Sequence, residues 1–163
     1  MATQYQNLSE YDSSTVPNAT EMRFGIVVSE WNQPITSALL QGAYATLVAH
    51  GAKEEHIFVH YVPGAFELTF GAKLLAEKLR VDAVIGLGCI IRGETPHFDF
   101  ISQGVTQGFV DLNMQYQLPF VFGVLTNDTM QQSFDRAGGK HGNKGDEAAV
   151  TAIKMVAFAK KLA

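Results

Sequence analysis

A chain of 163 residues with 47% apolar and only 17% charged side chains has the length and composition of one globular domain, not of a disordered protein. Its formal net charge of -4, without a basic patch interleaved with aromatics, argues against a nucleic-acid partner. No apolar run approaches the roughly 20 residues that a membrane-spanning helix needs, so a membrane is not expected either.

The first 21 residues are polar and contain Pro17, and they predict a tail, 1–21, that is flexible or packed on a neighbouring subunit. They lack the apolar segment of a signal peptide. Cys89 is the only cysteine, which excludes an intramolecular disulfide and favours a reducing compartment. We therefore expect a cytoplasmic protein. Residues 22–163 show no repeat, linker or break in composition and predict a single domain.

Strand and helix patterns alternate along this domain. β-branched and apolar runs predict four strands, at residues 22–30, 56–62, 81–91 and 118–126. A helical pattern follows each strand, and helices are expected at residues 34–51, 64–79, 98–117, 128–138 and 145–162. This alternation predicts an α/β domain with an open parallel sheet and right-handed crossovers. Ligands of such sheets bind beyond the carboxyl ends of the strands, where the most informative residues of the chain lie.

The segment "GCIIRGETPHFD" (88–99) joins the most apolar strand to the next helix. Thr95 is a suitable N-cap and Pro96 a suitable first helical residue. Phe98 cannot supply the carboxylate of a capping box, so the free N–H groups and the helix dipole favour an anion there. His97, in the first turn, is kept neutral by the dipole and could act as a base. A histidine at a helix start is also common without a function, and the residues alone leave both alternatives open.

Other candidates lie at the neighbouring strand ends. Glu67, in "VPGAFEL" (62–68), could accept hydrogen bonds from substrate hydroxyls or simply favour the helix dipole. Trp31 could stack on a heteroaromatic ring or cap the core. The loop with Arg136 matches no nucleotide-binding motif; it could bind a phosphate or be solvated surface. Cys89 is interpreted as a buried apolar residue rather than a nucleophile.

Together, "VPGAFEL", "GCIIRGETPHFD" and "RAGGKHGNKGDEAA" (136–149) have the order and spacing of one enzyme family. From about Phe24 onwards the chain resembles the 6,7-dimethyl-8-ribityllumazine synthases. The resemblance implies a flavodoxin-like three-layer sandwich with a four-stranded parallel sheet flanked by helices. It implies a transferase that condenses 5-amino-6-(D-ribitylamino)uracil with 3,4-dihydroxy-2-butanone 4-phosphate and releases phosphate and water. This is the penultimate step of riboflavin biosynthesis, and it needs no metal or organic cofactor.

The resemblance also implies roles for individual residues. His97 matches the proposed acid/base. The residues that match the pyrimidine and ribityl site are Trp31, Ala65, Phe66, Glu67, Cys89, Ile90, Ile91 and Phe122. Those that match the phosphate site are Glu94, Thr95 and Arg136. Phe122 and Arg136 correspond to groups contributed by a neighbouring subunit. Trp31 departs from the Phe that is common in the family, and Glu94 is expected to bind through its backbone N–H with its side chain turned away.

Shared active sites imply a homo-oligomer, and family members form pentamers or icosahedral shells of twelve pentamers. The short connector "GGKHGNKG" (138–145) lacks the insertion that the resemblance associates with isolated pentamers, so we expect the 60-subunit shell. Small-molecule substrates are the expected partners, and riboflavin synthase is a candidate protein partner. Two alternatives remain open: an archaeal-type riboflavin synthase, which shares the fold, and a non-catalytic shell protein that binds a flavin or lumazine.

Overall fold

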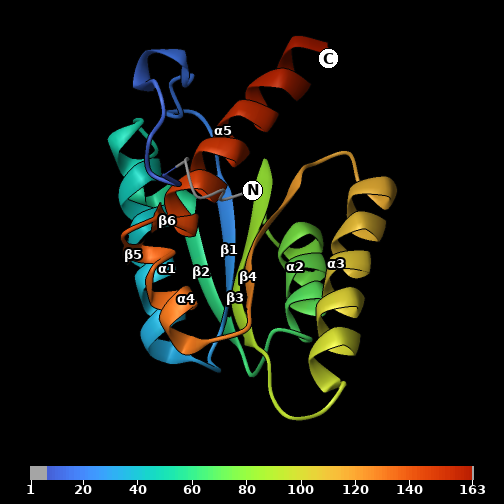
Figure 1. Cartoon of the computed structure of the whole chain (residues 1–163). Helices are drawn as coiled ribbons and strands as arrows, with labels where there is room; N and C mark the ends of the chain where they lie inside the picture. Colours follow the sequence, from blue (N-terminus) through green and yellow to red (C-terminus); the bar gives the residue numbers. More distant parts are fainter. Residues whose placement is uncertain (1–6, 163) are drawn as a thin grey trace.

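The computed structural model describes residues 7–162, which form a parallel sheet between two layers of helices (Figure 1). The strands are β1 (Phe24–Ser29), β2 (Ile57–Val62), β3 (Ala83–Ile91) and β4 (Phe120–Asn127). Their order in the sheet is β2-β1-β3-β4, and every neighbouring pair is parallel. The predicted α/β fold with a four-stranded parallel sheet is confirmed.

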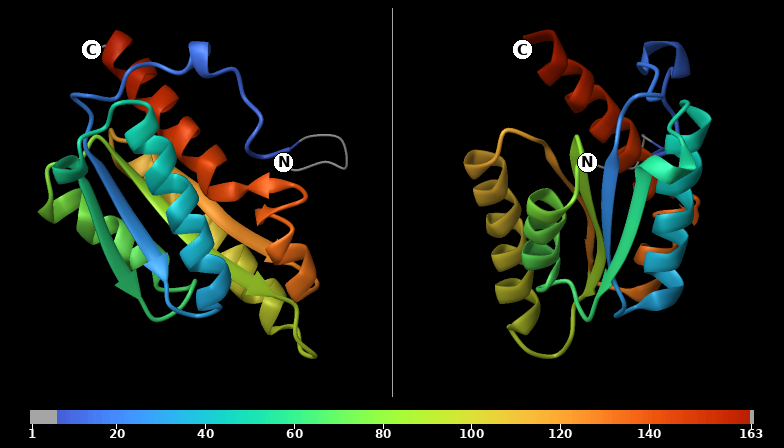
Figure 2. Two further views of the ribbon diagram at one scale, coloured as in Figure 1. Left: turned by 90° about the vertical axis from the view of Figure 1, so that its left-hand side faces the viewer. Right: turned by 180° about the vertical axis from the view of Figure 1, so that it is seen from behind.

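Two helices cover each face of the sheet (Figure 2). α1 (Gln33–Ala49) and α5 (Lys144–Leu162) pack together on one face, and α2 (Leu68–Lys78) and α3 (His97–Gln115) cover the other. β3 is therefore buried along nearly its whole length, as its continuous apolar sequence predicts. None of the helices in residues 7–162 is long and apolar enough to cross a membrane.

The sheet separates two apolar cores, and successive residues of each strand point to opposite ones. On β1, Ile26 belongs to the core under α1 and α5, whereas Val27 belongs to the core under α2 and α3. Val105, Phe109 and Leu112 are the buried residues of α3, as its helical spacing predicts. The packed layers hold the strand ends, and the connections that follow them, in a defined arrangement.

The start of α3 differs by one residue from the sequence prediction. The helix begins at His97, with Pro96 rather than Thr95 in the N-cap position. The φ of Pro96 is -62°, and its carbonyl accepts from the N–H of Asp99 at 3.0 Å. Thr95 lies one step further out, where its Oγ1 accepts from the N–H of His97 at 3.4 Å. The proline, which lacks an N–H, is tolerated at this boundary without loss of a helical hydrogen bond.

The helix predicted from Asp128 to the glycines at 138–139 is wrong beyond its first turn. α4 (Met130–Phe134) begins with a capping box made by Thr129 and Gln132 and ends after five residues. A small antiparallel hairpin, β5 (Ala137–Gly139) and β6 (Gly142–Asn143), follows it. Gly138 and Gly142 have φ angles of 103° and 77°, in the left-handed region that favours glycine, and so they turn the chain back.

The described part of the predicted tail, residues 7–21, contacts its own chain at several points. The N–H of Leu8 donates to the carbonyl of His141 at 2.8 Å, and Val16 and Ala19 are buried in the core under α1 and α5. Two 3₁₀ turns, η1 (Ser13–Thr15) and η2 (Glu54–His56), complete the secondary structure. Residues 1–6 lie outside the described residues, and the division between tail and domain at residue 21 stays a prediction.

Candidate active site

The connections after β1, β2 and β3 enclose a crevice of about 520 Å³ at the carboxyl edge of the sheet. This edge faces downward in Figure 1. The volume is within the range of small-molecule sites, and the place is where parallel α/β sheets bind ligands. The predicted site residues that line the crevice are Trp31, Ala65, Phe66, Glu67, Cys89, Ile90, Ile91, Thr95 and His97.

Trp31 forms one wall of the crevice, between β1 and α1. Its side chain is 72% exposed, so the alternative that it caps the core is wrong. Its N–H donates to the carbonyl of Pro63 at 3.2 Å, which ties it to the turn after β2. The next residue, Asn32, has a left-handed φ of 61° and donates from Nδ2 to the carbonyl of Cys89 at 2.9 Å. These two bonds connect the ends of β1, β2 and β3.

The floor of the crevice is apolar. Cys89 and Ile90, at the end of β3, are 2% and 9% exposed. Burial raises the pKa of the Cys89 thiol, although a hydrogen bond to Oγ of Ser133 at 3.4 Å opposes the shift. The thiol is therefore neutral near pH 7, and a neutral thiol is a poor nucleophile. Cys89 is part of the apolar floor of the crevice, which agrees with its interpretation as a buried apolar residue rather than a nucleophile.

Glu67 lies on the connection after β2, just before α2 rather than inside its first turn. The helix begins at Leu68, and the carbonyl of Glu67 accepts from the N–H of Gly71 at 2.9 Å. The carboxylate lies over Gly64, where a Cβ would be only 2.9 Å from Oε2. A glycine at this turn therefore leaves room for the carboxylate at the mouth of the crevice.

The third side is the loop from Gly93 to Pro96 and the start of α3. Within the first turn of α3, the N–H of His97 donates to Thr95 Oγ1 at 3.4 Å and that of Asp99 donates to the Pro96 carbonyl at 3.0 Å, and the positive end of the helix dipole favours an anion at this end. Thr95 and His97 line the crevice here. Glu94 is exposed and is not part of the lining.

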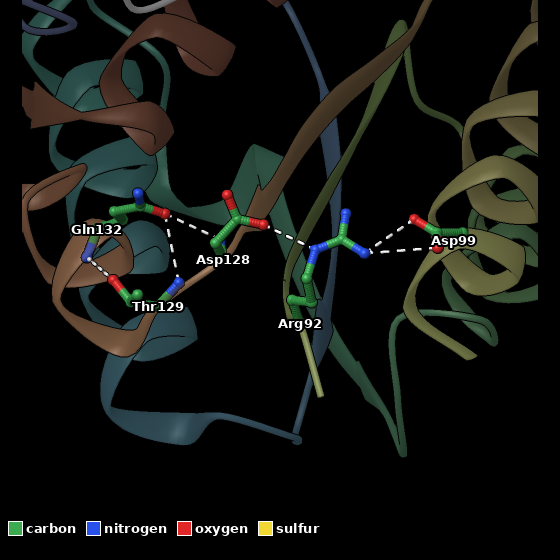
Figure 3. Close-up of polar contacts among 5 residues, drawn as sticks. All are labelled: Arg92, Asp99, Asp128, Thr129 and Gln132. Carbon is green, nitrogen blue, oxygen red and sulfur yellow. Dashed lines mark hydrogen bonds and ion pairs between the residues drawn. The ribbon is translucent and has the colours of Figure 1, made fainter. Parts of the chain in front are cut away.

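An ion-pair network lies beside this loop (Figure 3), and its charged residues are not among those that line the crevice. Arg92 donates from Nε to Asp128 Oδ1 at 2.8 Å, and its Nη1 lies 3.2 and 3.4 Å from the two carboxylate oxygens of Asp99. Its guanidinium carbon lies 4.2 Å from the centre of the Phe98 ring. Hydrogen bonding with Asp128, and the charge of Asp99, raise the pKa of Arg92.

Two predicted residues lie away from the crevice. Phe122, on β4, packs edge-on against Phe109 with ring centres 5.5 Å apart and borders a separate open hollow of about 750 Å³. Arg136 follows α4 and donates from Nη1 to the carbonyl of Gln132 at 3.0 Å. Within one chain, neither residue reaches the space between Trp31 and His97.

Sequence reasoning missed several residues that line the crevice: Asn32, Gly64, Gly93, Phe98 and Ile101. Asn32 could have been found, because Asn is among the few residues that adopt a left-handed conformation at a strand end. Within residues 7–162, no three His, Cys, Asp or Glu side chains are grouped as metal ligands would be. The site can thus offer an aromatic face, an apolar floor, a carboxylate, an anion-binding helix start and a histidine.

Comparison with known proteins agrees with this chemistry. A sequence model of the family described as 6,7-dimethyl-8-ribityllumazine synthase matches residues 21–160. A protein of that name from Parabacteroides distasonis is 67% identical over 158 residues, which are 97% of this chain and 99% of its own length. One from Phocaeicola vulgatus is 58% identical over 99% of this chain and 96% of its own length. One from Porphyromonas gingivalis is 57% identical over 95% of this chain and 96% of its own length. The chain belongs to the 6,7-dimethyl-8-ribityllumazine synthase family.

Proposed function

We propose that the chain is a transferase whose crevice condenses 5-amino-6-(D-ribitylamino)uracil with 3,4-dihydroxy-2-butanone 4-phosphate. The observation that carries the proposal is the combination, in one crevice, of Trp31, Glu67, Thr95 and His97. A flat ring with a polyhydroxylated chain needs a stacking surface and an acceptor for its hydroxyls, whereas a phosphate monoester needs N–H donors. The three sides of the crevice offer these groups separately.

In this proposal the pyrimidine ring lies on Trp31 above the apolar floor of Cys89, Ile90 and Ile91, and its ribityl chain extends along Ala65, Phe66 and Glu67. The phosphate binds at the start of α3, next to Thr95 and the backbone of Glu94. Holding two substrates in register contributes several kcal/mol, up to about 7–11 in the best cases. The attacking amine belongs to the pyrimidine substrate, so the reaction requires no nucleophile from the protein.

His97 is proposed to move protons during imine formation, phosphate elimination, ring closure and dehydration. A positioned acid/base of this kind contributes about 10²–10⁴-fold to the rate. His97 lies two residues after Thr95, so the proton carrier and the leaving phosphate would be neighbours.

Phe122 and Arg136 are proposed to complete the crevice of an adjacent subunit. Support comes from their position outside the crevice of their own chain, and from exposed aromatic side chains at its rim, with Trp31 and Phe66 exposed by 72% and 58%. The proposed assembly is a pentamer and, from it, a 60-subunit icosahedral shell, with riboflavin synthase as a candidate partner. The free, buried Cys89 supports a reducing, cytoplasmic setting.

The test is to mix the purified protein with the two substrates and to follow phosphate release and lumazine fluorescence together. We expect both signals to rise in equal amounts. Conversion of added lumazine to riboflavin without phosphate release would instead identify a riboflavin synthase. Binding of lumazine with no turnover of either kind would identify a non-catalytic shell protein. Light scattering tests the assembly, and a mass near that of one pentamer would contradict the proposed shell.

A further inference from the structure

We infer that Arg92 is a positioning residue for the reaction, which holds the start of α3, and with it His97, by bridging Asp99 and Asp128. The inference rests on the roles proposed above for Thr95 and His97. Arg92 does not line the crevice in the described structure, so its effect on the reaction would be exerted through the loop and the helix rather than through contact with a substrate.

Arg92 stands where three elements meet (Figure 3). It follows the last residue of β3, and its N–H continues the sheet by donating to the carbonyl of Asn127 at 2.9 Å. Its side chain reaches Asp99 in the first turn of α3 at 3.2 Å and Asp128, after β4, at 2.8 Å. One guanidinium thus connects the end of the sheet, the start of α3 and the connection to α4.

The Asp128 side of this bridge is itself held in place. The N–H of Asp128 donates to Oε1 of Gln132 at 2.8 Å, and the same amide oxygen accepts from the N–H of Thr129 at 3.3 Å. Gln132 and Thr129 form the capping box of α4, as Figure 3 shows. Arg92 is therefore anchored to a preformed turn on one side and holds α3 on the other.

The loop between Arg92 and His97 has little else to hold it. A Cβ added to Gly93 would meet nothing within 4 Å, so the space on that side of the loop is open. Glu94, Thr95 and Pro96 are exposed. The hydrogen bonds found for the loop in residues 7–162 lie within the first turn of α3 itself, where Thr95 Oγ1 accepts from the N–H of His97 and the Pro96 carbonyl accepts from the N–H of Asp99. The network at Arg92 is the polar link between this turn and the sheet, and Phe98 of the same turn also packs against the core under α2 and α3.

The geometry requires an arginine in particular. The planar fork of a guanidinium can engage two carboxylates and lie on an aromatic ring at once, whereas an ammonium is a point charge. Arg92 does all three, with Phe98, a crevice residue, under its guanidinium at 4.2 Å. Exposed ion pairs contribute little singly, but several charges that share one group act as a network. Phe98 precedes Asp99 in the same turn, so both contacts restrain that turn.

A competing explanation is that Arg92 binds the phosphate of the substrate itself. The two explanations differ in what they predict for Asp99. If Arg92 binds phosphate, neutralising Asp99 frees the guanidinium and leaves or improves phosphate binding. If Arg92 positions α3, neutralising Asp99 harms turnover in the same way as removing Arg92, because either change breaks the same link.

The experiment compares the kcat and KM values of Arg92→Ala, Asp99→Asn and the double variant, each as the assembled full chain. We expect each single variant to lower kcat by about tenfold, since a small misplacement of a catalytic group can cost up to about 10²-fold. The KM of the pyrimidine substrate should stay near wild type, because Trp31, Glu67 and Cys89 lie on other elements. The double variant should be no slower than Arg92→Ala, and Arg92→Lys should recover only part of the loss.

Lys53→Ala is the matched control, because it removes a cation from an exposed ion pair with Glu21 at 3.1 Å and should leave all constants unchanged. Asp99→Asn keeps the shape of its side chain, so it remains informative if Arg92→Ala folds poorly.

Wild-type kcat in both single variants, or losses of kcat that multiply in the double variant, would overturn the inference. The inference would also be overturned if Arg92→Ala had a raised KM for the phosphate substrate while Asp99→Asn kept the kinetic constants of the wild type. An inactive wild type would instead refute the proposed function.

Discussion

The side-chain amide of Asn32 donates to the backbone carbonyl of Cys89 at 2.9 Å, across the mouth of the crevice. This bond joins the residue after Trp31, at the start of α1, to the end of β3. Asn32 also has a left-handed φ of 61°, so its conformation and its hydrogen bond serve the same turn. The proposed stacking surface, Trp31, is therefore held beside the apolar floor by this bond of its neighbour and by its own N–H, which donates to the carbonyl of Pro63 at 3.2 Å.

Asn32→Gly should separate these two contributions. Glycine tolerates the left-handed conformation, so in the folded protein this variant loses only the hydrogen bond, at a cost of about 0.5–1.5 kcal/mol, beside about 0.4–1 kcal/mol for the greater entropy of the unfolded chain. Asn32→Ala adds the strain of a left-handed alanine, about 1–2 kcal/mol more. Both variants should raise the KM of the pyrimidine substrate more than that of the phosphate substrate. Urea unfolding and steady-state kinetics check this, and equal stability of the two variants would contradict it.

His97→Ala should slow the reaction without abolishing it. Loss of a positioned acid/base is expected to lower kcat by about 10² or more, whereas substrate positioning by the rest of the crevice remains. The matched control is His60→Ala, which removes an exposed histidine of β2 outside the crevice and should leave kcat unchanged. Full activity of His97→Ala in the phosphate-release assay would exclude the proposed role.

Arg136→Ala should raise the KM of the phosphate substrate most, with a smaller effect on the pyrimidine substrate. Lys140→Ala, which removes an exposed lysine that lies 3.1 Å from the carboxylate of Asp135, is the control for a lost cation in the same loop. If both substrates are weakened equally, the assignment of Arg136 to the phosphate is wrong.

A mixture of subunits tests whether the site is shared. When His97→Ala and Arg136→Ala chains are co-expressed, roughly a quarter of the interfaces of a heterologous ring combine an intact His97 with an intact neighbouring Arg136. At a phosphate-substrate concentration well below the KM of Arg136→Ala, we expect the mixed assembly to recover activity well above the mean of the two parents. Activity equal to that mean would show that both residues act within one chain.

The layers and the sheet could be predicted because their signals are local and repetitive. The continuous apolar run of β3 and the helical spacing of Val105, Phe109 and Leu112 each follow from burial on one or both faces. The hairpin after α4 could not be predicted in the same way. It depends on the conformations of Gly138 and Gly142 and on hydrogen bonds such as that from His141 to Asp135, which no periodic pattern records.

The crevice was predictable to the extent that its residues follow strands. Trp31, Glu67 and His97 each come just after a predicted strand, and parallel strands bring such residues to one edge. The link from Arg92 to Asp99 and Asp128 was not predicted, because it joins residues from two connections through side-chain geometry alone. The family resemblance supplied residue roles that spacing could not, including those of Phe122 and Arg136.

Cys89 should be inert in the folded protein although it lines the crevice. Burial raises the pKa of its thiol, so the reactive thiolate is scarce near pH 7. We expect iodoacetamide to modify Cys89 far more slowly in the native assembly than in urea, as measured by mass spectrometry. Cys89→Ala should retain turnover, with a modest increase in the KM of the pyrimidine substrate. Rapid alkylation of the native protein, or loss of turnover in Cys89→Ala, would contradict the interpretation of Cys89 as an unreactive part of the apolar floor.

Asp135 should make the fold sensitive to acid. Hydrogen bonds from Gln131 and Lys140 hold the pKa of its carboxyl below the ordinary value of 3.8. Because the folded-state pKa is lower than the unfolded one, the folded protein binds the proton less readily. The stabilising contribution is therefore complete above pH 3.8 and is lost as the pH falls through the lower folded-state pKa.

Asp135→Asn removes this dependence. Its unfolding free energy should be below that of the wild type at pH 6, and the difference should shrink towards pH 3. Urea titrations across this range measure the difference, and a gap that stays constant or widens in acid would contradict the assignment.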